Sequence, residues 1–287
     1  MRVPTVGIVT CRVLPEPDPD QELMLSELSS AGLSVQLLPW DDESADPAAF
    51  DACILRSCWD YHERPDDFLA WCDAAATQTR LLNPPTVVRW NAHKRYLRDL
   101  EAAGIPIVPT AFFDRASNSD LASLLDDRSW TDIVIKPCVS AGSARTRRFR
   151  DAARTDAANA AAFLAELTTT ADTMIQPFMP SVETTGERAA VWIAGQPTHA
   201  IVKQPRFHDD DESVSEAVPV TDTERELFDR CLALASEPVL YARLDTMPAA
   251  DGTPLISELE LIEPSLFLLQ SEAATRAFVE AVLRAAG

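Results

Sequence analysis

The stretch LISELELIEPSLF, residues 255–267, sets two carboxylates among aliphatic residues and then reaches a proline. Side chains alternate between the two faces of a β-strand, so Glu258 and Glu260 would share one face. Ile256 and Ile262 would lie beside them on that face. The two glutamate Cα atoms would be about 7 Å apart, and like charges that close repel each other. This stretch alone leaves two explanations open, a solvated face of a half-buried sheet or a site that holds a cation.

A third carboxylate is predicted to join the glutamate pair. The apolar segment VLYARLD, residues 239–245, indicates a strand that ends at Asp245. The Asp-Gly pair at 251–252 in the following connection is typical of a hairpin turn, and an antiparallel hairpin would bring Asp245 beside Glu258 and Glu260. Three carboxylates on a rigid sheet suit Mg²⁺, which prefers oxygen ligands and substrate phosphates. A bound cation would also remove the repulsion between the glutamates.

Lysine is rare in this chain. The 25 basic residues include only three lysines, which are Lys94, Lys136 and Lys203. Arginine serves most surface roles, so each lysine is a candidate for a contact that needs a compact ammonium group, such as a phosphate contact. Lys136 ends the short apolar strand DIVIKP, and Ser140, Ala141 and Gly142 follow in a turn of small residues. Such a turn lets backbone N–H groups approach phosphate oxygens. Chance retention on the surface is the alternative for each lysine.

The elements that position these residues begin with an alternation of strand and helix patterns. Strands are expected at 6–10, 33–38 and 51–55, and helices at 20–31 and 65–77. This alternation predicts a parallel α/β unit. Loops at the carboxyl ends of parallel strands tend to carry function, and Arg56 and Tyr61 follow the third strand. We interpret both as candidates for a substrate pocket, with a packed corner as the alternative.

The rest of the chain is predicted to contain both helices and strands. Residues 81–85 indicate a loop, and a helix is expected to follow, with Asn91 as its N-cap and Lys94 in its first turn. Further helices are expected at 157–168, 222–236 and 271–285, and strands at 132–137, 189–194, 198–203, 239–245 and 253–261. The polar stretch 208–221, which contains Asp210, Asp211 and Glu212, is predicted to be a mobile loop.

Composition excludes several classes of protein. The chain has 287 residues with 46% apolar and 24% charged residues, as expected for a soluble globular protein. The net charge of −20 argues against a nucleic-acid or anionic-membrane surface. Neither an apolar run of membrane-spanning length nor a signal peptide is apparent, so we expect a cytoplasmic protein. The six cysteines and four histidines lack zinc-ligand spacing, and free thiols are expected.

The order of these motifs resembles the ATP-grasp ligases over almost the whole chain. NAHKRYL is similar to the segment with the first nucleotide lysine, and VIKPCVSAG to the second lysine strand with its phosphate loop. MIQPFMPSVE is similar to the adenine hinge and ribose acid, and YARLD with ISELELIEP to the Mg²⁺ strands. Glu260 stands where Asn is usual. RSCWDY, THAIVKQP and ELELIEPSLFL resemble the cycloserine synthetase group, whereas GERAA lacks the hydroxyl residue expected after Gly-Glu.

The resemblance implies an α/β protein with an ATP-grasp fold. Its implied parts are an N-terminal parallel α/β domain at 1–88, a central subdomain at 89–185 and a C-terminal subdomain at 186–287. The implied nucleotide contacts are Lys94, Lys136, Ser140, Ala141, Gly142, Gln176 and Phe178, with Glu183 at the ribose. The implied ligands of one or two Mg²⁺ ions, or of Mn²⁺ instead, are Asp245, Glu258 and Glu260. The implied catalytic cations are Arg243, Arg188 and Lys203. His199 would join Arg56 and Tyr61 in the substrate pocket, with a core or surface role as the alternative.

The implied activity is ATP-dependent activation of a carboxylate as an acyl phosphate, followed by attack of an amine. A small amino-acid-like substrate is expected, as in the closure of O-ureido-D-serine to D-cycloserine, in a monomer or homodimer. A second hypothesis is a ligase that adds an amino acid to a peptide or protein tail. Its bulky acceptor would favour an open, basic groove, and the net charge of −20 argues against one. A regulatory protein that binds nucleotide without catalysis is a third, and the retained Asp245, Glu258 and Arg243 argue against it.

Overall fold

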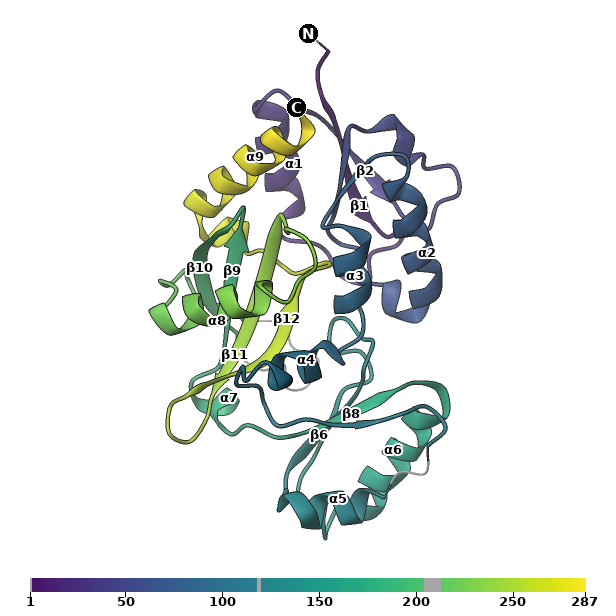
Figure 1. The fold of residues 1–287 in the computed structure, drawn as a ribbon, viewed down its shortest axis with the longest axis vertical. Coiled ribbons are helices and arrows are strands. Elements are labelled where there is room, and N and C mark those ends of the chain that lie inside the picture. The colour runs from purple at the N-terminus through teal and green to yellow at the C-terminus, as the bar shows by residue number, and fades with distance from the viewer. Residues whose placement is uncertain (1, 118–119, 204–212) are drawn as a thin grey trace.

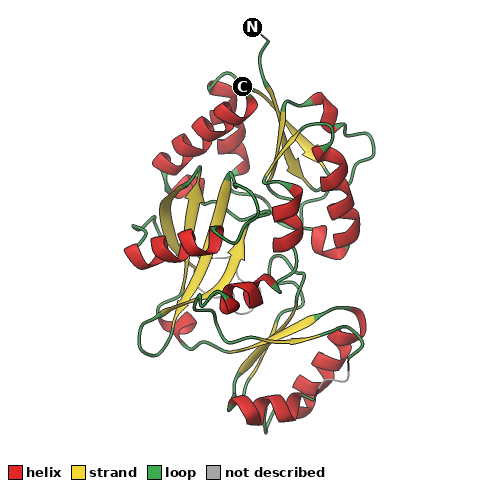
Figure 2. Cartoon of the chain, viewed as in Figure 1, coloured by secondary structure: helices red, strands yellow, loops and turns green. Residues whose placement is uncertain are grey.

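The computed structural model describes residues 2–117, 120–203 and 213–287, and this part of the chain contains three four-stranded sheets (Figures 1 and 2). The N-terminal sheet has the order β2-β1-β3-β4 and is parallel throughout. Its strands are β1 (Thr5–Thr10), β2 (Ser34–Pro39), β3 (Ala52–Leu55) and β4 (Arg80–Leu82). The connecting helices are α1 (Gln21–Ser30), the short η1 (Pro47–Ala49), η2 (Tyr61–Glu63) and α2 (Pro65–Ala76). The predicted parallel α/β unit is confirmed.

Burial explains the apolar runs of this sheet. Every residue of β3 is buried, as expected for a parallel strand covered by helices on both faces. α2 begins at Pro65, with Asp66 and Asp67 in its first turn, where a missing N–H and negative charge are both tolerated. The prediction of a loop at 81–85 is wrong at its start, because β4 pairs with β3 there. Three residues are too few to show a strand pattern.

The C-terminal sheet is antiparallel and has the order β10-β9-β11-β12. Its strands are β9 (Glu187–Ile193), β10 (Gln196–Lys203), β11 (Tyr241–Pro248) and β12 (Pro254–Glu260). The helices α8 (Asp222–Leu232) and α9 (Glu272–Ala286) pack on it. Alternation along β9 separates the two cores, since Ala190 clusters with Phe228 of α8 and Val191 clusters with Phe278 of α9. The short η3 (Leu268–Gln270) leads into α9.

The central sheet lies at the other end of the molecule and has the order β5-β8-β6-β7 (Figure 1). Its strands are β5 (Ala111–Phe113), β6 (Ile133–Pro137), β7 (Arg147–Phe149) and β8 (Thr173–Pro177). The helices α5 (Leu121–Arg128) and α6 (Ala157–Thr170) cover one face, and α7 (Ser181–Thr184) follows β8. Each sheet lies within one of the three predicted segments, 1–88, 89–185 and 186–287. The boundaries themselves stay a prediction.

The predicted helix around Lys94 is two helices, and this correction has a tertiary cause. α3 (Pro85–Asn91) ends at the residue expected to begin the helix, and α4 (Tyr96–Ala102) begins beyond Lys94. Asn91 does not cap a helix, because its Nδ2 donates to the carbonyl of Leu259 at 2.8 Å and its Oδ1 accepts from the N–H of Leu261 at 2.8 Å. Lys94 therefore lies in the break, where its backbone N–H donates to the carbonyl of Cys138.

Part of the predicted mobile loop pairs with the C-terminal sheet. Val214 and Val218 form isolated bridges with Lys203 and Ala200 of β10. Asp210, Asp211 and Glu212 lie outside the described residues. All six cysteines are buried free thiols, as expected.

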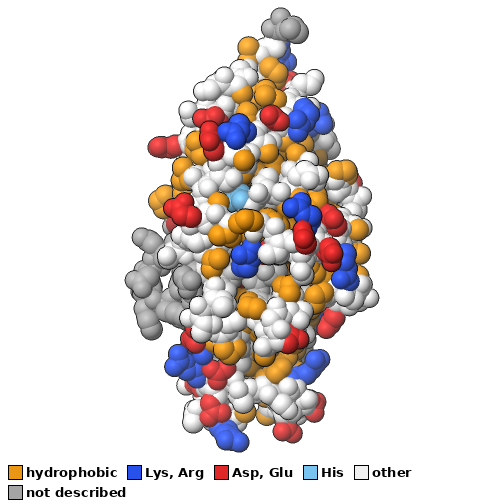
Figure 3. Space-filling model, turned by 90° about the vertical axis from the view of Figure 1, so that its left-hand side faces the viewer, with side chains coloured by type: hydrophobic (Ala, Val, Ile, Leu, Met, Phe, Trp, Pro, Cys, Tyr) orange, Lys and Arg blue, Asp and Glu red, His pale blue; other side chains and the backbone are white. Residues whose placement is uncertain are grey.

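The surface carries charge of both signs. On the face in Figure 3, acidic and basic side chains are interspersed among apolar ones. Among the residues described, no helix is both long and apolar enough to cross a bilayer.

Candidate active site

A cavity of about 760 Å³ forms where loops of the N-terminal sheet meet the central and C-terminal sheets. It brings together most of the residues that the sequence singled out. The predicted residues that line it are Tyr61, Lys94, Lys136, Ser140, Ala141, Gly142, Gln176, Phe178, Lys203, Arg243, Asp245, Glu258 and Glu260. The predicted residues that do not line it are Arg56, Glu183, Arg188 and His199.

The hairpin of β11 and β12 supplies the acidic wall of this cavity. Asp245 pairs with Glu258 and Arg243 pairs with Glu260, so the predicted antiparallel hairpin is confirmed. The register shifts after Asp245, since Thr246 pairs with Ile256. Strict alternation predicted Ile256 on the glutamate face, and this prediction is wrong because the bulge turns it into the buried cluster of α8.

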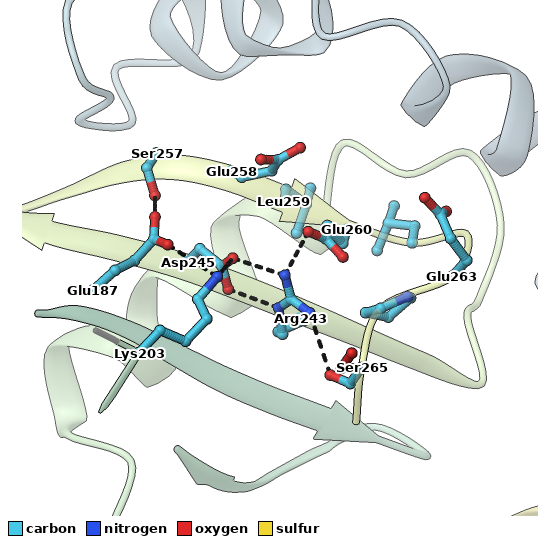
Figure 4. Close-up of polar contacts among 12 residues, drawn as sticks. Glu187, Lys203, Arg243, Asp245, Ser257, Glu258, Leu259, Glu260, Glu263 and Ser265 are labelled. Carbon is cyan, nitrogen blue, oxygen red and sulfur yellow. Dashed lines mark hydrogen bonds and ion pairs between the residues drawn. The ribbon is translucent and has the colours of Figure 1, made fainter. Parts of the chain in front are cut away.

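The charged centre of the cavity is a set of ion pairs on one face of the C-terminal sheet (Figure 4). The Lys203 ammonium lies 2.5 Å from Asp245 Oδ2 and 2.9 Å from Glu187 Oε2. Two nitrogens of the Arg243 guanidinium donate hydrogen bonds to the Asp245 carboxylate, Nε to Oδ1 at 2.8 Å and Nη2 to Oδ2 at 2.9 Å. The guanidinium also forms an ion pair with Glu260. Burial alone would raise the pKa of Asp245, but the two cations outweigh it and lower that pKa to about 2. Asp245 is therefore held ionised.

Lys94 connects the phosphate-loop side of the cavity to the hairpin. Its ammonium is buried, lies 2.6 Å from Glu258 Oε1 and donates to the carbonyl of Ser140 at 3.0 Å. Burial lowers the pKa of Lys94, but the adjacent Glu258 outweighs burial and raises it. The reciprocal effect of Lys94 on Glu258 also outweighs burial and lowers the carboxyl pKa. This lysine is charged and is already placed beside the loop predicted to hold phosphate.

Lys136 and the turn after β6 form the opposite wall. Among the described residues, Lys136 has neither a hydrogen bond nor an ion pair from its ammonium, and burial lowers its pKa. Gly142, Ser143 and Arg145 in the following turn all have positive φ angles, from 52° to 61°. A turn of this kind aims backbone N–H groups inward, as an anion site requires. An anion in the cavity would give Lys136 its partner.

The predicted adenine hinge lies at the edge of the same cavity. Gln176 of β8 is buried and donates to the hydroxyl of Thr110 at 3.0 Å. Arg148 lies over the ring of Phe178, 3.3 Å from its centroid, and pairs with Glu183 at 2.6 Å. Glu183 is thus outside the lining but is tied to a lining residue.

Strand alternation explains why Arg188 is not brought to the cavity. Its neighbour Glu187 faces the cavity with Lys203, so Arg188 points to the other face of the sheet and pairs with Glu224 of α8 at 2.6 Å. His199 is buried in the middle of β10 near Phe267 and does not line the cavity.

Arg56 is a structural bridge in this arrangement. It is buried, and it donates to the carbonyl of Pro264 at 2.8 Å while lying over the Tyr241 ring. It therefore holds the loop after β12 rather than lining the cavity.

The lining residues to which the sequence assigned no site role include Glu187, Ser257 and Glu263. The hydroxyl of Ser257 donates to Glu187 Oε1 at 2.5 Å. Glu187 could have been identified from the sequence, because side chains alternate along the GERAA segment and place Glu187 on the opposite face of the strand from Arg188. Ser257 could not have been identified in this way, because it lines the cavity as a result of the bulge in the pairing of β11 and β12. Glu263 was visible as the one acid of ELELIEP to which no role was given.

The three predicted metal ligands fit Mg²⁺ in chemistry but are occupied by cationic side chains. In the part of the chain that is described, no three His, Cys, Asp or Glu side chains converge at metal-binding distance. Ion pairs keep these carboxylates apart, because Glu258 is paired with Lys94 while Asp245 and Glu260 are paired with Arg243. Carboxylate oxygens remain the donors that Mg²⁺ prefers. Transfer of Lys94 from Glu258 to a phosphate would free that carboxylate for a metal.

Comparison with known proteins identifies the family. The family model described as "D-cycloserine synthetase DcsG, N-terminal domain" matches residues 6–83. The cycloserine biosynthesis protein DcsG of Streptomyces lavendulae is 30% identical over 293 residues, which cover 96% of this chain and 97% of that protein. The crystal structure of D-cycloserine synthetase DcsG has a TM-score of 0.88 at 29% identity, with 99% of this chain and 100% of that chain covered.

More distant solved structures share the architecture. D-alanyl-alanine synthetase A from Vibrio cholerae has a TM-score of 0.67 at 13% identity, with 99% of each chain covered. The ATP-grasp ligase PsnB has a TM-score of 0.67 at 16% identity, with 99% of this chain and 100% of that chain covered. These two likenesses show the fold alone. The fold, the cavity and the close relatives agree, and the chain belongs to the D-cycloserine synthetase family of ATP-grasp carboxylate–amine ligases.

Proposed function

We propose that this protein is an ATP-dependent cyclo-ligase that closes O-ureido-D-serine into the ring of D-cycloserine. The observation that carries the proposal is that Lys94, Lys136 and Asp245, which are far apart in the sequence, border the same cavity. Relatives named as D-cycloserine synthetase support the choice of substrate. The size of the cavity suits a nucleotide together with a small molecule.

The triphosphate of ATP would lie between the two lysines and the turn at 140–142. Lys136 faces the cavity without a partner in the described chain, and Lys94 reaches the carbonyl of Ser140. Gln176 and Phe178 would border the adenine, and Glu183 would accept from the ribose hydroxyls. Each contact pairs a group already at or beside the cavity with the part of ATP that it complements.

Phosphoryl transfer would take place at the hairpin. Asp245, Glu258 and Glu260 would hold one or two Mg²⁺ ions, which would shield the negative charge of the phosphates. Arg243 is fixed by Asp245 and Glu260, so its guanidinium would stabilise the transferring phosphoryl group without reorganising. Lys203, fixed by Asp245, would add positive charge at the same end.

The chemistry would then follow from positioning. An oxygen of the substrate carboxylate attacks the γ-phosphorus of ATP, ADP leaves, and an acyl phosphate forms. The nitrogen bound to the side-chain oxygen of the same molecule attacks the acyl carbon, its proton is lost, and phosphate leaves as the ring closes. Water then cleaves the carbamoyl group from that nitrogen, and this group leaves as carbamate, which breaks down to ammonia and CO2, so that D-cycloserine is released. Holding both ends of one substrate in the same cavity would favour the intramolecular attack over hydrolysis.

The test is turnover of O-ureido-D-serine with ATP and Mg²⁺, measured as ADP release and as D-cycloserine by mass spectrometry. Lys136→Ala is expected to weaken nucleotide binding about 100-fold, because a buried phosphate loses its charged partner. Glu258→Gln is expected to leave nucleotide binding measurable and to lower kcat about 100-fold or more. The exposed Arg276→Ala and Glu272→Gln serve as controls. Wild-type turnover by Glu258→Gln would contradict the metal assignment, and ADP release without D-cycloserine would contradict the substrate.

A further inference from the structure

Among the described residues that line the cavity, the charged groups without an ion pair include one ammonium and one carboxylate. Lys94 is paired with Glu258, and Lys203 and Arg243 are paired with the acids of the hairpin. Within the described residues, the Lys136 ammonium and the Glu263 carboxylate have neither a hydrogen bond nor an ion pair. A triphosphate supplies the missing partner of Lys136. The partner of Glu263 must be positive or must donate hydrogen bonds.

Glu263 lines the cavity, and its backbone is held by contacts with the N-terminal part of the chain. It follows β12, and its backbone carbonyl accepts the indole N–H of Trp59 at 3.0 Å. The next carbonyl, that of Pro264, accepts from Arg56 at 2.8 Å. The loop after β3 therefore fixes the backbone at Glu263 and at the next residue, and Trp59 and Tyr61 line the cavity there. In Figure 4 Glu263 lies apart from the Asp245–Lys203 pair, beyond Glu260.

Leaving this carboxylate unpaired is unfavourable. The residue is only 9% exposed, and burial together with the nearby Glu260 raises its pKa to about 8. A buried carboxylate without hydrogen bonds costs free energy in either protonation state, and a cationic partner removes that cost. Glu258 and Glu260 are committed to cations on the hairpin, whereas Glu263 is not.

We infer that Glu263 binds the α-ammonium group of the amino-acid substrate and so selects an amino acid over its desamino counterpart. This inference rests on the proposed function for the orientation of the substrate. The carboxylate to be activated lies at the γ-phosphate beside Arg243, and the ammonium is attached to the adjacent carbon. A receiving acid must therefore be close to the hairpin but outside the phosphate site, and Glu263 follows Glu260 by three residues. Glu263 acts by binding and positioning.

The experiment compares ligands with and without the ammonium group. Binding of O-ureido-D-serine and of 3-(ureidooxy)propanoic acid, its desamino analogue, is measured by calorimetry with Mg²⁺ and ADP present. D-serine and 3-hydroxypropanoic acid form a second pair. We expect the wild type to prefer each amino acid by about 10- to 100-fold, the range of one charge-assisted pair. Glu263→Gln should lose most of this preference, and Glu263→Asp, which keeps the charge, should retain part of it.

Two comparison variants sharpen the test. Glu16→Gln alters an exposed carboxylate that also lines the cavity, and Glu272→Gln alters a surface acid on α9. The proposal predicts that neither removes the preference and that ADP binding stays within about threefold in all variants. A preference that survives Glu263→Gln, that is lost in Glu16→Gln instead, or that the wild type lacks would overturn it. These readouts are equilibrium binding, so a failure to form D-cycloserine counts against the proposed function alone.

Discussion

Three acids of the hairpin and its following loop differ sharply in their proton affinity. Cations outweigh burial at Asp245 and lower its pKa to about 2. Burial and the neighbouring glutamates raise the pKa of Glu260 to about 7, although Arg243 opposes the shift. Burial raises the pKa of Glu263 to about 8, since no cation is paired with it in the described structure. The balance between burial, which raises each pKa, and the charges beside each acid therefore decides which acid is ionised at neutral pH.

The raised pKa of Glu263 predicts a pH-dependent stability. An acid whose folded pKa exceeds its ordinary value of 4.5 binds more protons in the folded state, so stability falls as pH rises from about 4.5 to about 8. The facing groups are Glu258, Glu260, Lys94 and Arg243. Glu263→Gln removes this loss. Without nucleotide, its Tm should exceed that of the wild type by about 5 °C more at pH 8.5 than at pH 5.5.

Thermal melts of both proteins across this pH range check the sign. Glu272→Gln is the matched control, because its carboxylate is exposed on α9. If the Tm difference between Glu263→Gln and the wild type is the same at every pH, the raised pKa of Glu263 is contradicted.

At the scale of elements, the outer edge of β12 is covered by the segment from β4 to β5. Asn83 donates to the carbonyl of Leu261, and Asn91 bonds the backbone of both Leu259 and Leu261. Further along the edge, the Tyr96 hydroxyl accepts from the Leu259 N–H. An edge strand with unpaired backbone groups needs such a cover. The same contacts interrupt the predicted helix and set Lys94 against the hairpin.

Asn91→Ala tests this coupling of packing and site. It leaves one buried N–H and one buried C=O on β12 without their partner, so the free energy of unfolding should fall by about 2–4 kcal/mol. Lys94 follows three residues later, and the KM for ATP should rise with the loss of stability. Urea unfolding and steady-state kinetics measure the two effects. Asn159→Ala, on the exposed side of α6, is the control and should change neither. An unchanged KM would show that Lys94 is positioned by other contacts.

At the scale of the molecule, the N-terminal and C-terminal sheets share one core, and one face of the central sheet has a core of its own. Val6 and Ile54 of the N-terminal sheet cluster with Val191 and Phe278 of the C-terminal part. α1 and α9 lie side by side over this core (Figure 1). The core of the central sheet includes Ile133 among residues that all lie between β5 and α7. The cavity lies between these two bodies, so a nucleotide would contact both.

Hydrogen exchange tests this division. We expect backbone amides at 139–148 and in the central sheet to exchange faster than those of the N-terminal and C-terminal sheets, because a smaller core opens at lower free energy. Mg²⁺-ADP should protect residues 139–148 about tenfold or more while leaving β1 and β9 unchanged. Uniform protection over all three sheets would indicate a single cooperative unit instead.

The sequence by itself determined the features that depend on local pattern. Alternation of apolar and polar residues predicted the parallel N-terminal unit, and the Asp-Gly turn predicted the hairpin that sets Asp245 opposite Glu258. The scarcity of lysine singled out Lys94, Lys136 and Lys203, all three of which line the cavity. These signals are reliable because periodicity and turn chemistry act over a few neighbouring residues.

Tertiary structure decided the features that depend on distant partners. The break around Lys94 follows from bonds between Asn91 and β12, and no proline or glycine marks it in the sequence. The bulge at Ser257 needs the register of β11, and the exclusion of Arg188 needs its partner Glu224 on α8. Glu263 is distinctive because Glu258 and Glu260, the acids before it, are paired with cations while its own carboxylate has no ion pair among the described residues. Pairing is a property of groups brought together by folding, so no local pattern of residues contains it.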